Sequence, residues 1–338
     1  MGVYVLTYFN LGTFCHIFIL YSNIFIKNIS KVKPLFRTEI METPILFIIF
    51  KRYDTANQVF NRIREARPKH LYVAADGPRL DVPGEVEDCT LTRSIIEKVD
   101  WDCDVHTLFQ TENQGCGIGP FKAISWFFEH VDMGIILEDD CLPDNDFFKY
   151  CEEMLIRYKD DHRIALITGR NNFDIMPHDN ASYFLSAFHF CWGWASWSRV
   201  WKEYDYSLST KTATDYFKHL VRYFGIWNLG VVLWRMNIFF SCKRNQPRDI
   251  WDYQFCISTQ LHDQFTIVPK KNLVRNIGFD ERATHTGGGI DNIEVGKICP
   301  LIHTDNLKYF RKIDVVYSRK RCKTLKSVYY FIRNVVNL

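Results

Sequence analysis

Short apolar runs and amphipathic segments alternate along the chain from Met41 onward. A continuous apolar run, such as residues 45–50, is typical of a strand that is buried on both faces. The segments between these runs place apolar residues at helical spacing. The predicted strands are residues 45–50, 70–75, 105–109, 134–137 and 164–167, and the predicted helices are residues 54–67, 92–99, 121–130 and 147–158. This alternation predicts an α/β fold with a mostly parallel sheet that is flanked by helices.

The helix at residues 147–158 is the clearest of these, because its apolar residues fall on one face. Asp144 or Asp146 is its predicted N-cap. After about Tyr206 the alternation fades into aromatic-rich and polar segments. We therefore divide the chain into an N-terminal hydrophobic segment (1–40), a first lobe that carries the sheet (41–205), a smaller second lobe (206–300) and a basic tail (301–338).

The first 26 residues contain no charged side chain, and this length permits a membrane span. Positive charges follow between Lys27 and Arg37, so a span here would keep the rest of the chain in the cytoplasm by the positive-inside rule. Met41 immediately precedes the first strand, and residues 1–40 are alternatively an upstream translation artefact. Eleven cysteines without a disulfide-framework or zinc spacing also favour a reducing, cytoplasmic compartment.

The formal net charge of +3 is too small to predict a nucleic-acid partner. The charge is unevenly distributed, since residues 307–333 contain nine Lys or Arg residues and a single acid, Asp314. A basic segment with interleaved apolar and aromatic residues is typical of a solvated tail helix or of a surface for anionic lipid. The second alternative predicts peripheral contact with the inner face of the membrane.

Three consecutive acids, Glu138, Asp139 and Asp140, follow a predicted buried strand directly. Adjacent carboxylates repel each other and are costly near a core, and a divalent cation removes the difficulty. Carboxylate oxygens suit Mg²⁺ or Mn²⁺, which also bridge to the phosphates of a nucleotide. The alternative is a solvated acidic turn, and we favour the metal–diphosphate site.

Two further residues, Arg52 and Asp76, follow predicted strands and so fall at the same edge of the sheet. Asp76 is either a turn residue before Gly77 or an acceptor for the base or ribose of a nucleotide. Arg52 is either a solvated residue at a helix start or a contact to base or phosphate. The glycine-rich segment 115–120 lacks the register of a phosphate loop, and a tight turn that opens a helix is the better interpretation.

Four tryptophans crowd into a short stretch, and they fit either a sugar-stacking platform or a packed core at the junction of the lobes. We favour the core. The residues are Trp192, Trp194, Trp197 and Trp201.

Several segments together resemble a known family. The strongest is Leu137-Glu138-Asp139-Asp140 followed by Pro143 and the helix start at residues 146–150, and weaker ones are Gly193-Trp194, Trp251-Asp252 and Thr284-His285-Thr286-Gly287. Over roughly residues 44–289 the chain resembles the N-acetylglucosaminyltransferase I group. It is also similar to bacterial nucleotide-diphospho-sugar transferases related to that group, some of which are labelled hemolytic-protein-like.

The resemblance implies a GT-A fold, a nucleotide-diphosphate sugar as donor (most often UDP-linked), a Mn²⁺ or Mg²⁺ ion and inversion at the anomeric carbon. It makes residues 41–205 the nucleotide-sugar-binding lobe and residues 206–300 the acceptor-side lobe. The implied roles are Asp140 as metal ligand, Glu138 and Asp139 as contacts to the donor sugar and ribose, Arg52 and Asp76 as contacts to the base, Gly193, Trp194 and His285 as further donor-site residues, and Asp252 as general base.

The implied reaction is transfer of a hexosyl or N-acetylhexosaminyl group to a hydroxyl of a glycan or lipid-linked acceptor, as in polysaccharide biosynthesis. The chain departs from the animal enzymes in its anchor polarity and its glycine-rich segment, so N-glycan processing is not expected. One alternative is a nucleotidyltransferase acting on sugar phosphates, which would need a basic glycine-rich loop where this chain has Lys51 and Arg52. The other is a non-catalytic sugar-binding protein.

Overall fold

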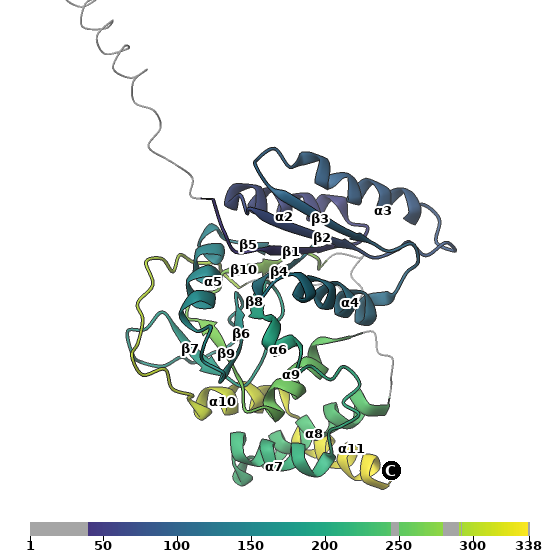
Figure 1. Ribbon diagram of the computed structural model, residues 1–338. Coiled ribbons are helices and arrows are strands. Elements are labelled where there is room, and N and C mark those ends of the chain that lie inside the picture. Colours follow the sequence, from purple (N-terminus) through teal and green to yellow (C-terminus); the bar gives the residue numbers. More distant parts are fainter. Residues whose placement is uncertain (1–39, 245–249, 280–290, 292, 337–338) are drawn as a thin grey trace, which may run out of the picture. The chain divides into compact units, whose positions relative to one another are not determined.

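The computed structural model describes residues 40–244, 250–279, 291 and 293–336 (Figure 1). The strands are β1 (Ile45–Ile49), β2 (His70–Ala75), β3 (Asp104–Phe109), β4 (Met133–Glu138), β5 (Cys141–Pro143), β6 (Ile164–Thr168), β7 (Tyr183–Ser186), β8 (Trp194–Trp197), β9 (Phe265–Pro269) and β10 (Val274–Asn276). The helices are α2 (Tyr53–Ala66), α3 (Glu85–Arg93), α4 (Gly115–His130), α5 (Asn145–Arg157), α6 (Ser198–Trp201), α7 (Ala213–Phe224), α8 (Leu229–Arg244), α9 (Asp252–Leu261), α10 (Arg311–Arg321) and α11 (Thr324–Val336), with short 3₁₀ helices η1 (Ser94–Lys98) and η2 (Ile226–Asn228).

Eight strands form one sheet in the order β3-β2-β1-β4-β8-β6-β9-β7. The first four run parallel, and β6 and β9 are also parallel to each other. Strand β8 is antiparallel to both β4 and β6, and β7 is antiparallel at one edge. The prediction of an α/β fold with a mostly parallel sheet flanked by helices is confirmed.

The strand order reverses beside β1, because the chain passes from β1 to β2 on one side while β4 pairs with β1 on the other. In open sheets of this kind, ligands bind beyond the carboxyl ends of the strands at such a reversal. Arg52 lies just after β1, and the acids Glu138, Asp139 and Asp140 lie at the end of β4. The topology therefore brings these residues to one place.

Two helices begin earlier than predicted. The predicted helix at residues 92–99 is instead the end of α3 followed by η1, and the glycine-rich segment 115–120 is the first part of α4. The carboxylate of Asp76 accepts hydrogen bonds from the backbone N–H groups of Gln114 (2.8 Å) and Gly115 (3.0 Å). These donors would otherwise lack a partner at the start of α4, so a residue far away in sequence sets the beginning of this helix.

Helix α5 begins as predicted. Of its two candidate N-caps, Asp144 is the one that caps it, because its carboxylate accepts from the backbone N–H of Asp146 at 3.1 Å. The carboxylate of Asp146 instead accepts the N–H groups of Ile298 (2.9 Å) and Cys299 (3.0 Å). The two acids thus fix α5 at its start and tie a later segment to it.

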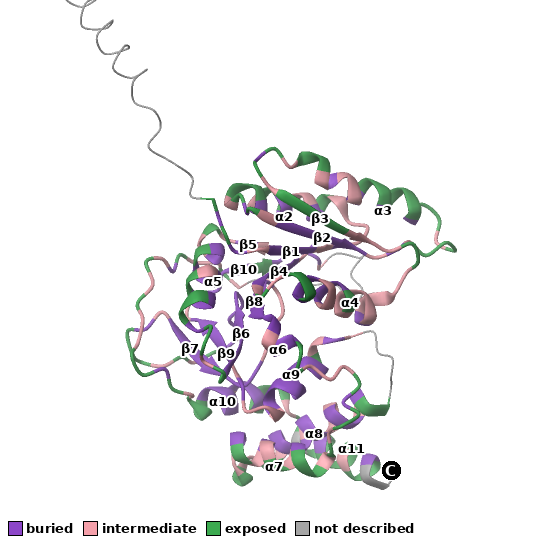
Figure 2. Cartoon of the chain, viewed as in Figure 1, coloured by how far each residue is buried: buried purple, intermediate pink, exposed green. Residues whose placement is uncertain are grey.

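Two clusters of buried apolar residues form the core, one around the central strands and one among α7, α8, α9 and α10 (Figure 2). The tryptophan stretch belongs to the first cluster, with Trp194, Trp197 and Trp201 only 0%, 3% and 7% exposed. Trp192 is partly buried beside them. The prediction that this stretch is core rather than a sugar-stacking platform is confirmed for the three buried rings.

The predicted acceptor-side range, residues 206–300, contributes α7, α8 and α9 to the second cluster but also strands β9 and β10. The predicted basic tail, residues 301–338, forms α10 and α11. Asp314 on α10 is fully buried and accepts hydrogen bonds from Ser186 Oγ (2.8 Å) and the N–H of Ala187 (2.7 Å) at the end of β7. Among the helices that the structure describes, none has the length and apolar content needed to cross a membrane.

His189 connects the two halves of the core through its ring. Nε2 lies 2.6 Å from Thr259 Oγ1 on α9, and Nδ1 lies 2.7 Å from Thr266 Oγ1 on β9. Burial lowers the pKa of His189 to about 3, well below its ordinary value of 6.5. The native state therefore holds this ring neutral at pH values where the unfolded chain protonates it.

We predict that His189 makes the protein less stable in acid. Between about pH 6.5 and pH 3 the unfolded state binds one more proton at this residue. Its contribution to the free energy of unfolding is therefore complete above pH 6.5 and falls by up to about 1.4 kcal/mol per pH unit below it. Urea unfolding of wild type and His189→Gln at several pH values measures this. The difference in stability should narrow as the pH falls, and a pH-independent difference would show that His189 is not held neutral.

Candidate functional site

The acids after β4 meet an arginine that follows β1. The two strands are neighbours with Ile48 opposite Glu138, so Arg52 lies across from Asp139 and Asp140. Its Nη2 donates to Asp139 Oδ1 at 2.5 Å and to Asp140 Oδ2 at 2.9 Å. The three side chains are only 16%, 7% and 17% exposed. This is a largely desolvated ion cluster at the point where the strand order reverses.

The balance of charge in the cluster is negative. Burial, followed by the charges of Asp140 and Asp139, raises the pKa of Glu138 to about 8. Burial also raises the pKa of Asp139 to about 6, although Arg52 opposes the rise. Burial works against the charge of Arg52, but the two carboxylates outweigh it and raise its pKa further. Arg52 therefore stays fully charged and offsets only part of the negative charge of the triplet.

A two-stranded ribbon of β5 and β10 passes next to the triplet. The N–H of Ile277, just after β10, donates to the backbone oxygen of Asp140 at 2.8 Å. At Gly278 the backbone runs so close that an added Cβ would clash with Asp140 Oδ2 and would lie 2.5 Å from Arg52 Nη1. Glycine is needed here because only a residue without a side chain leaves both groups in place.

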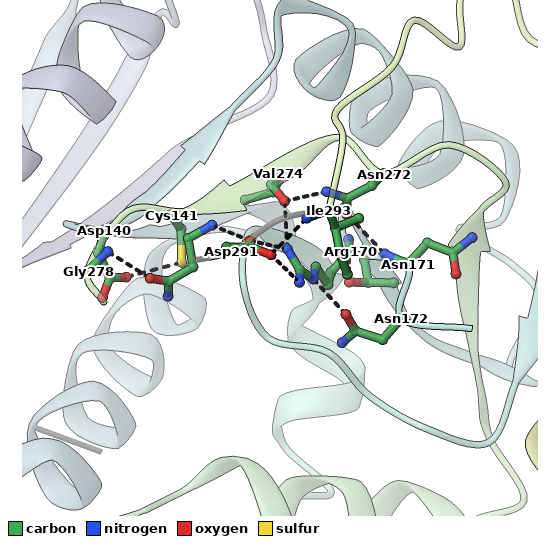
Figure 3. Close-up of polar contacts among 12 residues, drawn as sticks. Asp140, Cys141, Arg170, Asn171, Asn172, Asn272, Val274, Gly278, Asp291 and Ile293 are labelled. Carbon is green, nitrogen blue, oxygen red and sulfur yellow. Dashed lines mark hydrogen bonds and ion pairs between the residues drawn. The ribbon is translucent and has the colours of Figure 1, made fainter. Parts of the chain in front are cut away.

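A buried ion pair anchors this ribbon from the other side (Figure 3). Arg170, which is 4% exposed, pairs with Asp291, with Nη2 to Oδ1 at 2.8 Å. Its Nε donates to Asn172 Oδ1 at 2.8 Å, and its guanidinium lies 5.0 Å from the centre of the Trp192 ring. Asp291 also accepts from the N–H of Asn276 in β10 at 3.0 Å. The pair thereby holds β10, and with it the backbone that leads to Gly278.

Sequence reasoning did not find Arg170, Asn172 or Asp291. The signal for the first two is the polar stretch shortly after the buried strand β6, since Arg52 and Asp139 also lie shortly after the ends of their strands. Asp291 carries no local signal, because it lies 121 residues from its partner.

Asp252 is the first residue of α9 and lies on the second-lobe side of the site. Its charge contributes to the raised pKa of Glu138, after burial and the two other acids. Burial raises the pKa of the Cys191 thiol well above its ordinary value, and both Asp252 and Glu138 add to this rise. Trp251, which is 4% exposed, packs its ring 5.7 Å from that of Trp194 and so fixes the start of α9. Asp252 is therefore near enough to Glu138 to influence its pKa, and its role as general base stays a prediction.

Gly193 precedes β8, and Trp194 is the first residue of that strand. Gly193 has φ +65°, and its carbonyl oxygen accepts from the N–H of Gly169 at 2.8 Å. Trp194 is fully buried, so its predicted contact with a donor is corrected to packing against Trp201, Trp251 and Phe255. His285, another predicted donor-site residue, lies outside the described residues.

Asp76 is turned toward its own loop. Its two carboxylate oxygens accept from the N–H groups of Gly77, Gln114 and Gly115 and from Asn113 Nδ2, all at 2.8–3.1 Å. A carboxylate has about four acceptor positions, and these four donors fill them. Asp76 therefore has a structural role at the start of α4, and its contact to a nucleotide base stays a prediction.

The side chains near Asp140 suit a hard divalent cation only if a bound phosphate group supplies some of the metal ligands. Among the described residues there is no group of three or more His, Cys, Asp or Glu side chains arranged to hold a metal ion. Asp140 offers carboxylate oxygens, one shared with Arg52 and one 3.5 Å from Cys141 Sγ. Such a donor set fits Mg²⁺ or Mn²⁺ that takes its remaining ligands from phosphate and water.

Two surface hollows, of about 340 and 420 Å³, lie away from these acids. The first is lined by α7 residues such as Lys218 and His219, and the second by residues around Arg157 and Arg163. Charge and topology, rather than concavity, therefore identify the candidate site.

No family model and no curated protein matches the chain. Solved structures that it resembles include HddC from Yersinia pseudotuberculosis, with a TM-score of 0.33 and 12% identity over 48% of this chain and 80% of that one. Another is the inositol-1-phosphate CTP transferase from T. maritima, with a TM-score of 0.37 and 9% identity over 68% of this chain and 85% of that one. With TM-scores this low, neither likeness establishes a shared function.

We predict that Arg52→Met lowers the free energy of unfolding by roughly 3 kcal/mol, because it leaves Asp139 buried without its cation. The double variant Arg52→Met/Asp139→Asn should recover part of that loss, since the carboxylate that needs neutralising is also removed. Urea unfolding of the wild type, both single variants and the double variant measures the coupling. Losses that simply add would show that the two side chains do not neutralise each other.

Proposed function

We propose that this chain is a metal-dependent glycosyltransferase of the GT-A kind, which transfers a sugar from a nucleotide-diphosphate donor to a hydroxyl group with inversion. One observation carries the proposal. Acids at the end of β4 lie where the strand order reverses, next to Arg52 from β1 and within electrostatic reach of Asp252 from α9. The acids and Arg52 carry charges that complement those of a divalent cation and a diphosphate. Asp252 would suit the hydroxyl of an acceptor.

The donor half of the site consists of Arg52 and the triplet. Asp140 would hold Mg²⁺ or Mn²⁺, which when bound stabilises the negative charge of the departing nucleotide diphosphate. Asp139 and Glu138 would accept hydrogen bonds from ribose and sugar hydroxyls. Arg52, which is held between Asp139 and Asp140, adds a permanent positive charge beside the phosphates. UDP-linked sugars are the donors that the sequence resemblance favours.

The acceptor half depends on Asp252. A carboxylate in the first turn of a helix is stabilised in its charged form by the partial positive charge of the helix N-terminus. As a base it would take the proton of the acceptor hydroxyl while that oxygen attacks the anomeric carbon. The nucleotide diphosphate leaves from the opposite face, so the configuration inverts. The acceptor class we propose is a glycan or a lipid-linked glycan.

Two observations lead us to prefer this proposal to the two alternatives. A nucleotidyltransferase would need a glycine-rich basic loop after its first strand, but α2 begins at Tyr53, almost directly after β1. Lys51 in this short connection is already paired with Glu85 at 2.6 Å. A sugar-binding protein would use exposed rings, whereas three of the four clustered tryptophans are buried.

The chemistry of the products tests the proposal. We expect purified protein with Mn²⁺ and a panel of nucleotide-diphosphate sugars to release a nucleoside diphosphate, and Asp140→Asn to lose this release while remaining folded. Ion-exchange chromatography separates nucleoside diphosphate from pyrophosphate. Pyrophosphate formed from a nucleoside triphosphate and a sugar phosphate would establish nucleotidyl transfer instead. Release that persists with excess chelator would contradict the role of the metal.

A second prediction concerns Asp252. Asp252→Asn should leave donor binding near normal and reduce kcat by roughly 10²–10⁴-fold, the usual span for a positioned general base. Asp215→Asn is the matched control, because Asp215 also lies in the first turn of a helix but belongs to α7. Both variants lose a similar interaction with a helix N-terminus. A change confined to KM, or equal loss of kcat in both variants, would place the base elsewhere.

A further inference from the structure

Helix α11 carries a row of apolar residues on its outside. Leu325, Tyr329 and Ile332 follow one another at helical spacing and are 88%, 62% and 56% exposed. On an ordinary surface helix such a row faces the core. A contiguous exposed apolar row therefore indicates a surface that meets a partner or a membrane.

The inner face of α11 packs on α8 through Phe331, whose ring lies 6.2 Å from that of Phe240, and through polar contacts. Asn237 on α8 donates through Nδ2 to the backbone oxygen of Ser327 at 2.9 Å, and it accepts from Asn334 Nδ2 at 2.9 Å. Ser327 and Asn334 are each 4% exposed. These contacts fix the orientation of α11 about its own axis. The packing of the helix on α8 therefore turns the apolar row outward.

Basic side chains surround the apolar row. Lys323, Lys326 and Arg333 are exposed on or next to α11, and Arg319, Lys320 and Arg321 are exposed at the end of α10. All nine Lys and Arg residues between residues 307 and 333 are exposed, whereas the only acid in this stretch, Asp314, is fully buried. The outer face of this segment is therefore apolar and positively charged.

A further exposed aromatic lies nearby. Trp227 in η2 is 94% exposed. Its neighbour Asn228 accepts a hydrogen bond from Arg319 Nη2 at 2.7 Å, which ties η2 to the end of α10. Trp is the side chain that most favours the boundary between lipid headgroups and acyl chains.

We propose that this surface, made of Leu325, Tyr329 and Ile332 with the surrounding basic residues and Trp227, docks on the face of an anionic lipid bilayer. Apolar and aromatic side chains enter the headgroup boundary while Lys and Arg contact anionic headgroups. A second copy of the chain would bring two strongly positive faces together. A nucleic acid would engage the charges but not the aliphatic residues. This docking is independent of the proposed function.

Vesicle co-sedimentation of the full chain tests the proposal. We expect binding to vesicles of equal parts phosphatidylcholine and phosphatidylglycerol, with weaker binding at high salt and much weaker binding to phosphatidylcholine alone. The variant Lys323→Gln/Lys326→Gln/Arg333→Gln should weaken partitioning by about 100-fold, at roughly fivefold per residue. The control Lys149→Gln/Lys159→Gln/Lys202→Gln removes the same charge from exposed positions elsewhere and should bind like wild type.

A second variant, Leu325→Gln/Tyr329→Gln/Ile332→Gln, removes the apolar side chains of the surface and should also lose binding to the vesicles. The single variants Trp227→Ser and Leu325→Gln keep the test valid if the triple variant is unstable, because these side chains are almost fully exposed. Equal binding of wild type and every variant would overturn the proposal. So would equal binding to both kinds of vesicle, or a concentration-dependent dimer without vesicle binding.

Discussion

Two adjacent carboxylates at the end of a buried strand need a positive charge, and in this protein Arg52 supplies it. The guanidinium reaches Asp139 and Asp140 from the neighbouring strand because β1 and β4 run parallel and in register. Removing either charge from water alone is costly, and the pair is retained only because each partner satisfies the other. The close approach of the backbone at Gly278 is possible for the same reason, since the two side chains are held in fixed positions beneath it.

A second ion pair has a similar part on the far side of the β5–β10 ribbon. Arg170 and Asp291 are both largely buried, and they link the end of β6 to the segment beyond β10. One arginine thus contacts the acids of β4 directly, and the other holds the ribbon whose backbone leads to Gly278. In the proposed donor site, such an arrangement would be preorganised, which lowers the cost of binding a ligand.

The local sequence pattern was enough to predict the elements that are buried on both faces. Strand β2 has the predicted bounds, and Asp144 is one of the two predicted caps of α5. The start of α4 was not predictable, because it depends on Asp76, 38 residues earlier. Strand β8 was also missed, since it is short and enters the sheet antiparallel between β4 and β6. Of the candidate residues, Arg52 and the acids of the triplet come together, whereas Trp194 and Asp76 have structural contacts that only the long-range packing reveals.

We propose that Asp140 and its neighbours bind a divalent cation together with a nucleoside diphosphate. Electron paramagnetic resonance of Mn²⁺ measures this directly, because the signal of the free ion disappears on binding. We predict weak binding of Mn²⁺ to the protein alone and much tighter binding when UDP is added, with the gain absent in Asp140→Asn. Tight binding without nucleotide, or an equal gain in the Asp140→Asn variant, would contradict the account.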